Sequence, residues 1–160
     1  MNLTLRVNGR EQRVQAEVHH TLLEVLRREL RLFGAREGCG VGMCGACTVL
    51  LDGQPVSSCL LLASEVRGRA IQTVEGLAAD DGLHPIQEAF VAHTAFQCSF
   101  CTPGMLLATK ALLAENPTPT DEEIADYLAG NLCRCGSYLK IVEAVRDASR
   151  RLAGSERPSV

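Results

Sequence analysis

Apolar residues occupy alternate positions from 3 to 7 and again from 14 to 18, which is the period of a strand with one buried face. The Asn8-Gly9 pair between these segments is a typical two-residue hairpin turn, because both residues tolerate positive φ. The chain is therefore predicted to begin with a β-hairpin.

Apolar residues then recur at helical spacing from 22 to 33. Thr21 and Glu24 can form a capping box at the start of this segment, and Gly34 suits the C′ position after its end. We expect a helix over about 22–33.

The region after this helix is rich in glycine and then returns to strand patterns. Six glycines lie between residues 34 and 53, around three cysteines. Strands are predicted over 48–51, 56–60 and 70–74, with a hairpin turn at Asp52-Gly53. The first half of the chain is thus predicted to be a small α+β domain.

The second half has a helical pattern. Pro85, and Thr102 as an N-cap before Pro103, are typical of helix starts, and Thr120 with Glu123 repeats the capping box. Prolines at 117 and 119 break the chain between two helices. We expect a bundle of four helices, over roughly 85–95, 103–115, 120–130 and 138–152.

These patterns divide the chain into two small domains. We predict an α+β domain over 1–76, a linker over 77–82, a four-helix domain over 83–153 and a flexible tail over 154–160.

The composition excludes several classes of protein. With 46% hydrophobic residues the chain can form real cores, and a net charge of −3 without a basic patch argues against a nucleic-acid partner. No basic segment followed by an apolar run begins the sequence, and no apolar stretch approaches the ~18 residues of a membrane span. We expect a cytoplasmic protein that does not bind membranes.

Eight cysteines in a chain expected in the cytoplasm favour metal binding over disulfides. A bond between Cys133 and Cys135 would also be strained, because a single residue separates them. The cysteines form two groups of four, one on each side of the predicted linker.

The first group lies in the glycine-rich region with spacing C-x4-C-x2-C-x11-C, and its first intervals match the plant-type loop of a [2Fe-2S] cluster. Glycines let the backbone approach closely and aim several N–H groups at negative sulfurs. Zinc is an alternative, although zinc motifs usually combine short cysteine pairs, and uncoordinated core cysteines are another. This group is Cys39, Cys44, Cys47 and Cys59.

The second group combines C-x2-C with C-x-C, and each pair precedes a predicted helix start. Two helix N-termini would therefore converge on the thiolates, and their partial positive charge would stabilise an anionic cluster. By itself this group fits zinc nearly as well; the first group beside it favours a second [2Fe-2S] cluster. Arg134 either adds a cation here or faces solvent. The group is Cys98, Cys101, Cys133 and Cys135.

Two such clusters without other catalytic groups indicate electron conduction, since each carries one electron and offers no open coordination site to a substrate. The four histidines are interpreted as structural or exposed, and the glycines of 38–42 belong to the cysteine loop rather than to a dinucleotide site. A stand-alone two-cluster ferredoxin or redox sensor and a zinc-stabilised binding module are the alternative functions.

Three segments resemble the small iron-sulfur subunit of the molybdenum hydroxylases, the family of xanthine dehydrogenase, aldehyde oxidoreductase and carbon monoxide dehydrogenase. They are EGCGVGMCGACTVLLDG at 37–53, QCSFCTPGM at 97–105 and GNLCRCGSY at 130–138, and the resemblance covers about residues 2–150. It implies a β-grasp ferredoxin domain followed by a four-helix [2Fe-2S] domain. It also implies a non-catalytic electron-transfer subunit, expected to be separately encoded.

The resemblance implies partners as well. The first cluster would lie toward a medium subunit that binds FAD, and the second beside the molybdopterin cofactor of a large subunit, in a dimer of heterotrimers. Electrons would pass singly from molybdenum through both clusters to FAD. Gln97 would hydrogen-bond the pterin, although by position alone it would be an exposed loop residue, and the Cys135 sulfur would accept a hydrogen bond from it. Ser99 and the Gly136-Ser137 pair differ from the residues of many relatives, so the local geometry around the second site is expected to differ from theirs.

Overall fold

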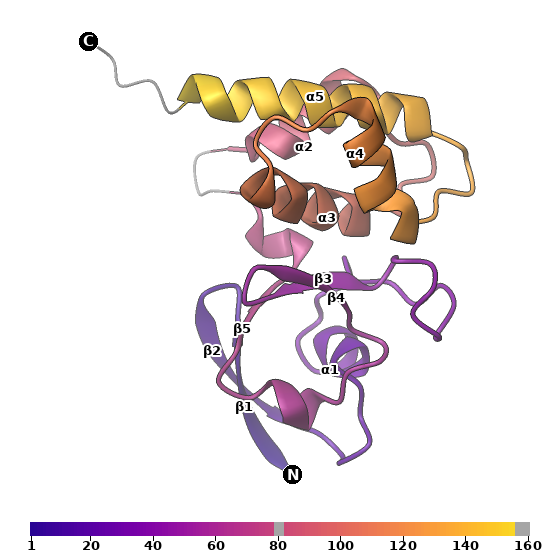
Figure 1. The fold of residues 1–160 in the computed structure, drawn as a ribbon. Coiled ribbons are helices and arrows are strands. Elements are labelled where there is room, and N and C mark those ends of the chain that lie inside the picture. Colours follow the sequence, from indigo (N-terminus) through magenta and orange to yellow (C-terminus); the bar gives the residue numbers. More distant parts are fainter. Residues whose placement is uncertain (79–81, 156–160) are drawn as a thin grey trace.

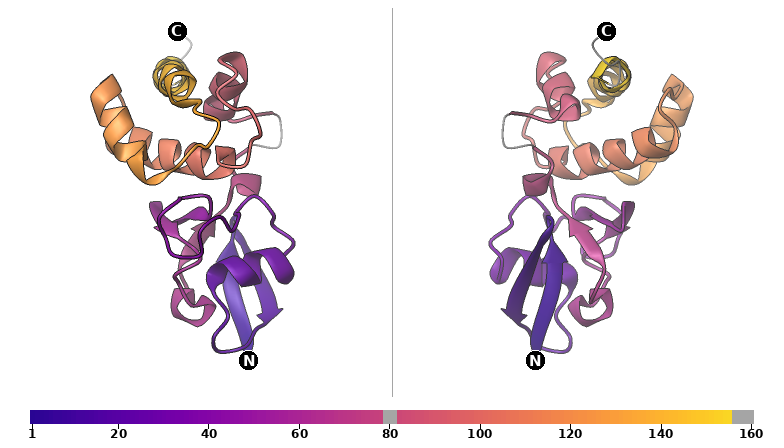
Figure 2. Two further views of the ribbon diagram at one scale, coloured as in Figure 1. Left: turned by 90° about the vertical axis from the view of Figure 1, so that its right-hand side faces the viewer. Right: turned by 90° about the vertical axis from the view of Figure 1, so that its left-hand side faces the viewer.

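A mixed sheet built by the first half of the chain carries a layer of helices built by the second half (Figures 1 and 2). The computed structural model describes residues 1–78 and 82–155. None of the helices in these two ranges combines the length and the apolar character needed to cross a bilayer. The predicted α+β organisation is confirmed, with strands and one α-helix first and the longer helices afterwards.

The sheet has the strand order β2-β1-β5-β3-β4. The β1–β5 pair is parallel, and the other neighbouring pairs are antiparallel. Its inward residues form one core with helix α1 (Leu22–Arg28). The strands are β1 (Asn2–Val7), β2 (Arg10–Gln15), β3 (Thr48–Leu51), β4 (Gln54–Ser57) and β5 (Ala70–Gln72).

Both predicted hairpin turns are present. Asn8 and Gly9 have φ of 50° and 76°, and Asp52 and Gly53 have φ of 51° and 86°. Positive φ at both central residues gives the turn a twist that matches the flanking strands. The turns therefore set the register of β1 on β2 and of β3 on β4.

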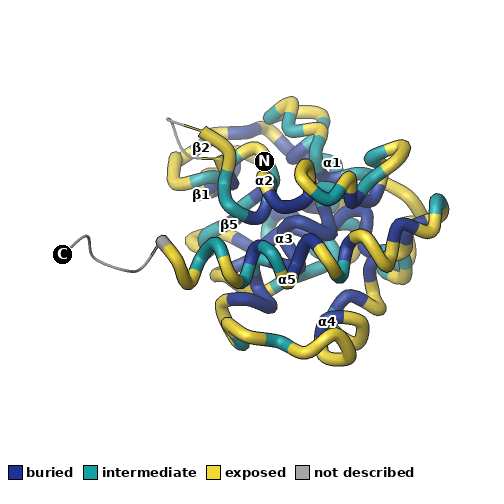
Figure 3. Tube along the Cα trace, turned by 90° about the horizontal axis from the view of Figure 1, so that it is seen from above, coloured by how far each residue is buried: buried dark blue, intermediate teal, exposed yellow. Residues whose placement is uncertain are grey.

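The second half forms the helices that lie above the sheet in Figure 1. Seen from above, α3 crosses the centre of the molecule beneath α5 and is largely buried (Figure 3). It packs against β3 below and against α2 and α4 beside it, which explains why apolar residues cover most of its surface. The α-helices are α2 (Pro85–Ala92), α3 (Thr102–Glu115), α4 (Asp121–Tyr127) and α5 (Tyr138–Ser155). Short 3-10 turns are η1 (Ala63–Val66), η2 (Val74–Gly76) and η3 (Leu128–Gly130).

Several predicted boundaries are wrong. Helix α1 ends at Arg28 rather than near residue 33, because Arg31 takes a left-handed φ of 57° and turns the chain before Gly34 is reached. The N-cap of α3 is Cys101 rather than Thr102. Strand β4 covers 54–57 rather than 56–60, because the Asp52-Gly53 turn starts it two residues earlier.

The predicted linker and tail are only partly described. Residues 79–81 and 156–160 lie outside the described residues. Gly154 is helical and belongs to α5 rather than to the predicted tail.

The two layers meet at a close backbone contact. A Cβ atom added to Gly104 of α3 would stand 2.3 Å from the Gly45 carbonyl oxygen. The Asn131 side chain donates to the same oxygen at 3.0 Å, and Leu50, Leu107 and Ala111 form a small apolar cluster alongside. The absence of a side chain at Gly104 thus lets the helical layer rest on the first cysteine loop.

We predict that Gly104→Ala lowers the free energy of unfolding by about 1–3 kcal/mol, because the added methyl must displace the Gly45 backbone. Chemical denaturation measures this change. Gly130→Ala is the matched control, because a Cβ there meets no atom within 4 Å. Equal stability of the two variants would contradict the tight contact.

Candidate metal centres

The four cysteines of the first group meet beside β3 and β4 as two pairs. Cys47 Sγ and Cys59 Sγ are 3.4 Å apart, and the Cys44 thiol lies within hydrogen-bonding reach of Cys39. The charge of Cys39 also contributes to the raised pKa of Cys59, so the two pairs lie close to one another. All eight cysteines lie in the described residues and are free thiols.

Backbone N–H groups point at the exposed sulfur of Cys39. Val41 N and Met43 N donate to Cys39 Sγ at 3.4 and 3.3 Å. The residues before them, Gly40 and Gly42, have φ of 68° and 77°, a conformation that favours glycine. The Val41 and Cys44 N–H groups lower the pKa of Cys39 to about 7, because they stabilise its thiolate.

The second group also forms two pairs, between α3 and α5. The Cys98 thiol lies within hydrogen-bonding reach of Cys135, and the Cys101 thiol within reach of Cys133. Burial raises the pKa of Cys101 to about 12. Helices α3 and α5 begin beside these residues, so the predicted convergence of two helix N-termini is confirmed.

The surroundings of Cys133 favour its thiolate. Burial alone would raise the pKa of this thiol, yet the Ser137 N–H, the Cys101 thiol and the Ser137 hydroxyl lower it. The N–H of Cys133 itself donates to the Tyr138 hydroxyl at 2.8 Å. Tyr138 thereby fixes the backbone of a candidate ligand, a role that the sequence did not reveal.

Two buried hydroxyls beside the second group have no assigned acceptor in the described chain. Thr102 Oγ1 follows Cys101, and Ser137 Oγ precedes α5. A serine in front of a helix ordinarily accepts from the first-turn N–H groups, but Ser137 lies close enough to influence Cys133 instead. A hydroxyl at Ser137 that can donate toward Cys133 fits a site whose sulfurs carry negative charge.

Two neighbouring thiol pairs are the donor set of a two-iron core, in which each iron takes two thiolates. The residues present therefore fit one [2Fe-2S] cluster in each group.

The other predicted residues occupy varied positions. Gln97 and Arg134 are both exposed. His84 caps α2 by accepting from Ile86 N, and His93 lies 3.2 Å from Asp147. The structural interpretation of these two histidines is thus confirmed.

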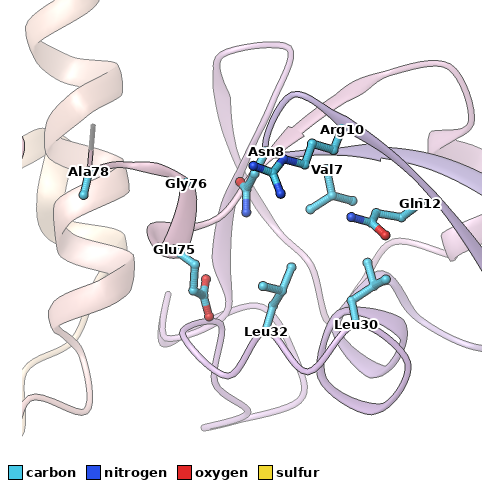
Figure 4. Close-up of a pocket in the computed structure, with 9 residues that line it drawn as sticks. All are labelled: Val7, Asn8, Arg10, Gln12, Leu30, Leu32, Glu75, Gly76 and Ala78. Atoms are coloured by element: carbon cyan, nitrogen blue, oxygen red, sulfur yellow. The ribbon is translucent and has the colours of Figure 1, made fainter. Parts of the chain in front are cut away.

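A pocket beside η2 contains no cysteine (Figure 4). Two of its polar side chains are already engaged, since Asn8 hydrogen-bonds Thr73 and the Glu75 carboxylate accepts from Gly34 N. The pocket is lined by Val7, Asn8, Arg10, Gln12, Leu30, Leu32, Glu75, Gly76 and Ala78.

Comparison with known proteins agrees with both centres. Residues 5–78 match the 2Fe-2S iron-sulfur cluster binding domain, and residues 73–146 match the [2Fe-2S] binding domain. The chain is 50% identical over 148 residues to the nicotine 6-hydroxylase small subunit of Paenarthrobacter nicotinovorans, covering 92% of this chain and 89% of that protein. It is 45% identical over 153 residues to the nicotinate dehydrogenase small FeS subunit of Eubacterium barkeri, covering 96% and 98%.

A solved structure shares the whole fold. A chain of quinoline 2-oxidoreductase from Pseudomonas putida 86 superposes with a TM-score of 0.93 at 40% identity, covering 99% of this chain and 98% of that one. With both family matches, paired thiols in each group and near-complete coverage of the small subunits, the chain belongs to the small iron-sulfur subunits of the molybdenum hydroxylase family.

Proposed function

We propose that this chain conducts single electrons from a molybdenum-pterin centre on a large subunit to FAD on a medium subunit. Each [2Fe-2S] cluster, when bound, takes up and releases one electron. The protein supplies the ligands, the hydrogen bonds to the sulfurs and the distance between the sites. The chain itself transforms no substrate.

The proposed ligands follow the two groups. The proposed division of the chain into domains is the predicted one: a β-grasp ferredoxin domain over 1–76 and a four-helix [2Fe-2S] domain over 83–153. The proposed location of the complex is the cytoplasm. The family matches at 5–78 and 73–146 support a boundary near residue 76. The first cluster is assigned to Cys39, Cys44, Cys47 and Cys59, and the second to Cys98, Cys101, Cys133 and Cys135.

One hydrogen bond carries the proposal. The N–H of Leu132 donates to the Cys44 carbonyl oxygen at 2.9 Å. Cys44 belongs to the first group, and Leu132 is bonded to Cys133 of the second. A short path of covalent bonds and one hydrogen bond therefore joins a ligand of each site, as expected of a chain that passes electrons between them.

Exposed apolar residues surround the second group. Leu139 is 81% exposed, and Leu132, Tyr138 and Phe100 are about half exposed. We assign this surface to the large subunit, with Gln97 and the Cys135 sulfur toward the pterin. Apolar side chains exposed beside a cysteine site are typical of a surface that a partner covers.

A second apolar surface surrounds the exposed Cys39. Met43 is 73% exposed, and Val41 and Leu60 are more than half exposed. We assign this surface to the FAD-binding subunit. The two surfaces belong to different layers, so one chain can contact both partners, and a dimer of such heterotrimers is the proposed assembly.

Cysteine variants test the two-site assignment. In the reduced full-length protein, Cys135→Ser is expected to disturb only one of two paramagnetic signals, because its ligand group is separate from the first. Cys44→Ser is expected to disturb the other signal. Electron paramagnetic resonance measures both, and joint loss of the signals in well-folded variants would contradict independent sites.

A surface variant tests the proposed large-subunit contact. Leu139→Glu is expected to raise the Kd for the molybdopterin-binding subunit at least tenfold, about 1.4 kcal/mol, because it places an unpaired charge in an apolar contact. Binding is measured with the purified subunits, and cluster absorbance should stay unchanged. Val18→Glu is the control. Val18 is also an exposed apolar residue, at 68%, but it lies in the first domain beside the N-terminus and not at the second cysteine group. Equal affinity of the two variants would contradict this assignment.

A further inference from the structure

Arg36 reaches from the first domain into the ligand loop of the second centre. It lies three residues before Cys39, yet its guanidinium donates to the Ser99 carbonyl oxygen. The guanidinium carbon also stands 5.5 Å from the centroid of the Phe100 ring. Ser99 and Phe100 are the two residues that separate Cys98 from Cys101.

The Phe100 ring in turn lies against the first cysteine loop. A Cβ atom added to Gly38 would stand 3.6 Å from Phe100 Cε1 and 2.8 Å from Cys44 Sγ. The ring beneath the Arg36 guanidinium therefore approaches the backbone beside a candidate ligand of the first cluster. One arginine thus contacts residues that border both centres.

The charge of Arg36 has no carboxylate partner within 1–78 and 82–155. The side chain is partly buried, and the ion pairs of the described residues do not include it. The carboxylate of the adjacent Glu37 lies near Gly40 instead. A partly buried cation is stabilised further by nearby negative charge, and an oxidised cluster with four thiolates carries roughly −2.

We propose that Arg36 has two roles. As a positioning residue it holds the 98–101 loop against the 39–47 loop, and as a cation it is shared by both clusters. The inference rests on the proposed function, because it requires both cysteine groups to bind clusters. A reduced cluster is one charge more negative than an oxidised one, so a nearby cation favours reduction. Arg36 is therefore expected to raise the midpoint potentials of both clusters.

The test is a redox titration of the full-length protein, followed by electron paramagnetic resonance after iron analysis has confirmed loaded clusters. In Arg36→Met, both midpoints should move to more negative potentials. At each wild-type midpoint, the ratio of reduced to oxidised cluster should fall at least threefold. Arg13→Met is the matched control and should leave both midpoints unchanged, because Arg13 is exposed on β2 at the far edge of the sheet.

Two further variants separate charge from position. Arg36→Gln keeps a donor for the Ser99 carbonyl without the charge, so both midpoints should still fall. Arg36→Lys keeps the charge but not the planar group over Phe100, so the midpoints should stay near wild type. In Arg36→Lys the contact that holds the two loops together is weakened. The spin–spin splitting between the two reduced clusters, which reports their separation, should therefore decrease in this variant.

Several results would overturn the proposal. They are midpoints in Arg36→Met or Arg36→Gln that shift no more than in Arg13→Met, a shift confined to one cluster, or wild-type splitting in Arg36→Lys. If Arg36→Met does not load its clusters, Arg36→Gln still decides the electrostatic part. A wild-type protein without clusters would instead contradict the proposed function itself.

Discussion

The close approach of two backbones, Gly45 in the first cysteine loop and Gly104 in α3, is the constraint on which the arrangement depends. The same place contains the bonds from Asn131 to Gly45 O and from Leu132 N to Cys44 O. A side chain at Gly45 or Gly104 would separate the layers and lengthen the path between the cysteine groups. The absence of side chains at these two glycines thus lets the two cysteine-containing loops lie close together.

The cysteine pKa values show what each site requires. N–H groups already favour the thiolate at exposed Cys39, whereas burial raises the pKa of Cys59 to about 11 and that of Cys101 to about 12. These two thiols keep their protons at neutral pH unless a metal displaces the protons. Cluster binding therefore supplies the positive charge that makes burial of these sulfurs favourable.

Local sequence signals predicted the parts of the structure that depend on local chemistry. Asn8-Gly9 and the capping box at Thr21 are correct because turns and caps involve neighbouring residues. The cysteine spacings predicted which thiols would meet. The end of α1 could not be predicted, because it depends on a turn at Arg31 that contains no glycine. The contact of Arg36 with Ser99 could not be predicted either, because it depends on packing between segments about sixty residues apart.

The metal content of protein purified without air tests the central claim most directly. Two [2Fe-2S] clusters require about four irons and four labile sulfides per chain, measured by elemental and sulfide analysis together with visible absorption. Zinc close to one or two atoms per chain, or a colourless iron-free protein with all eight thiols intact, would contradict the account.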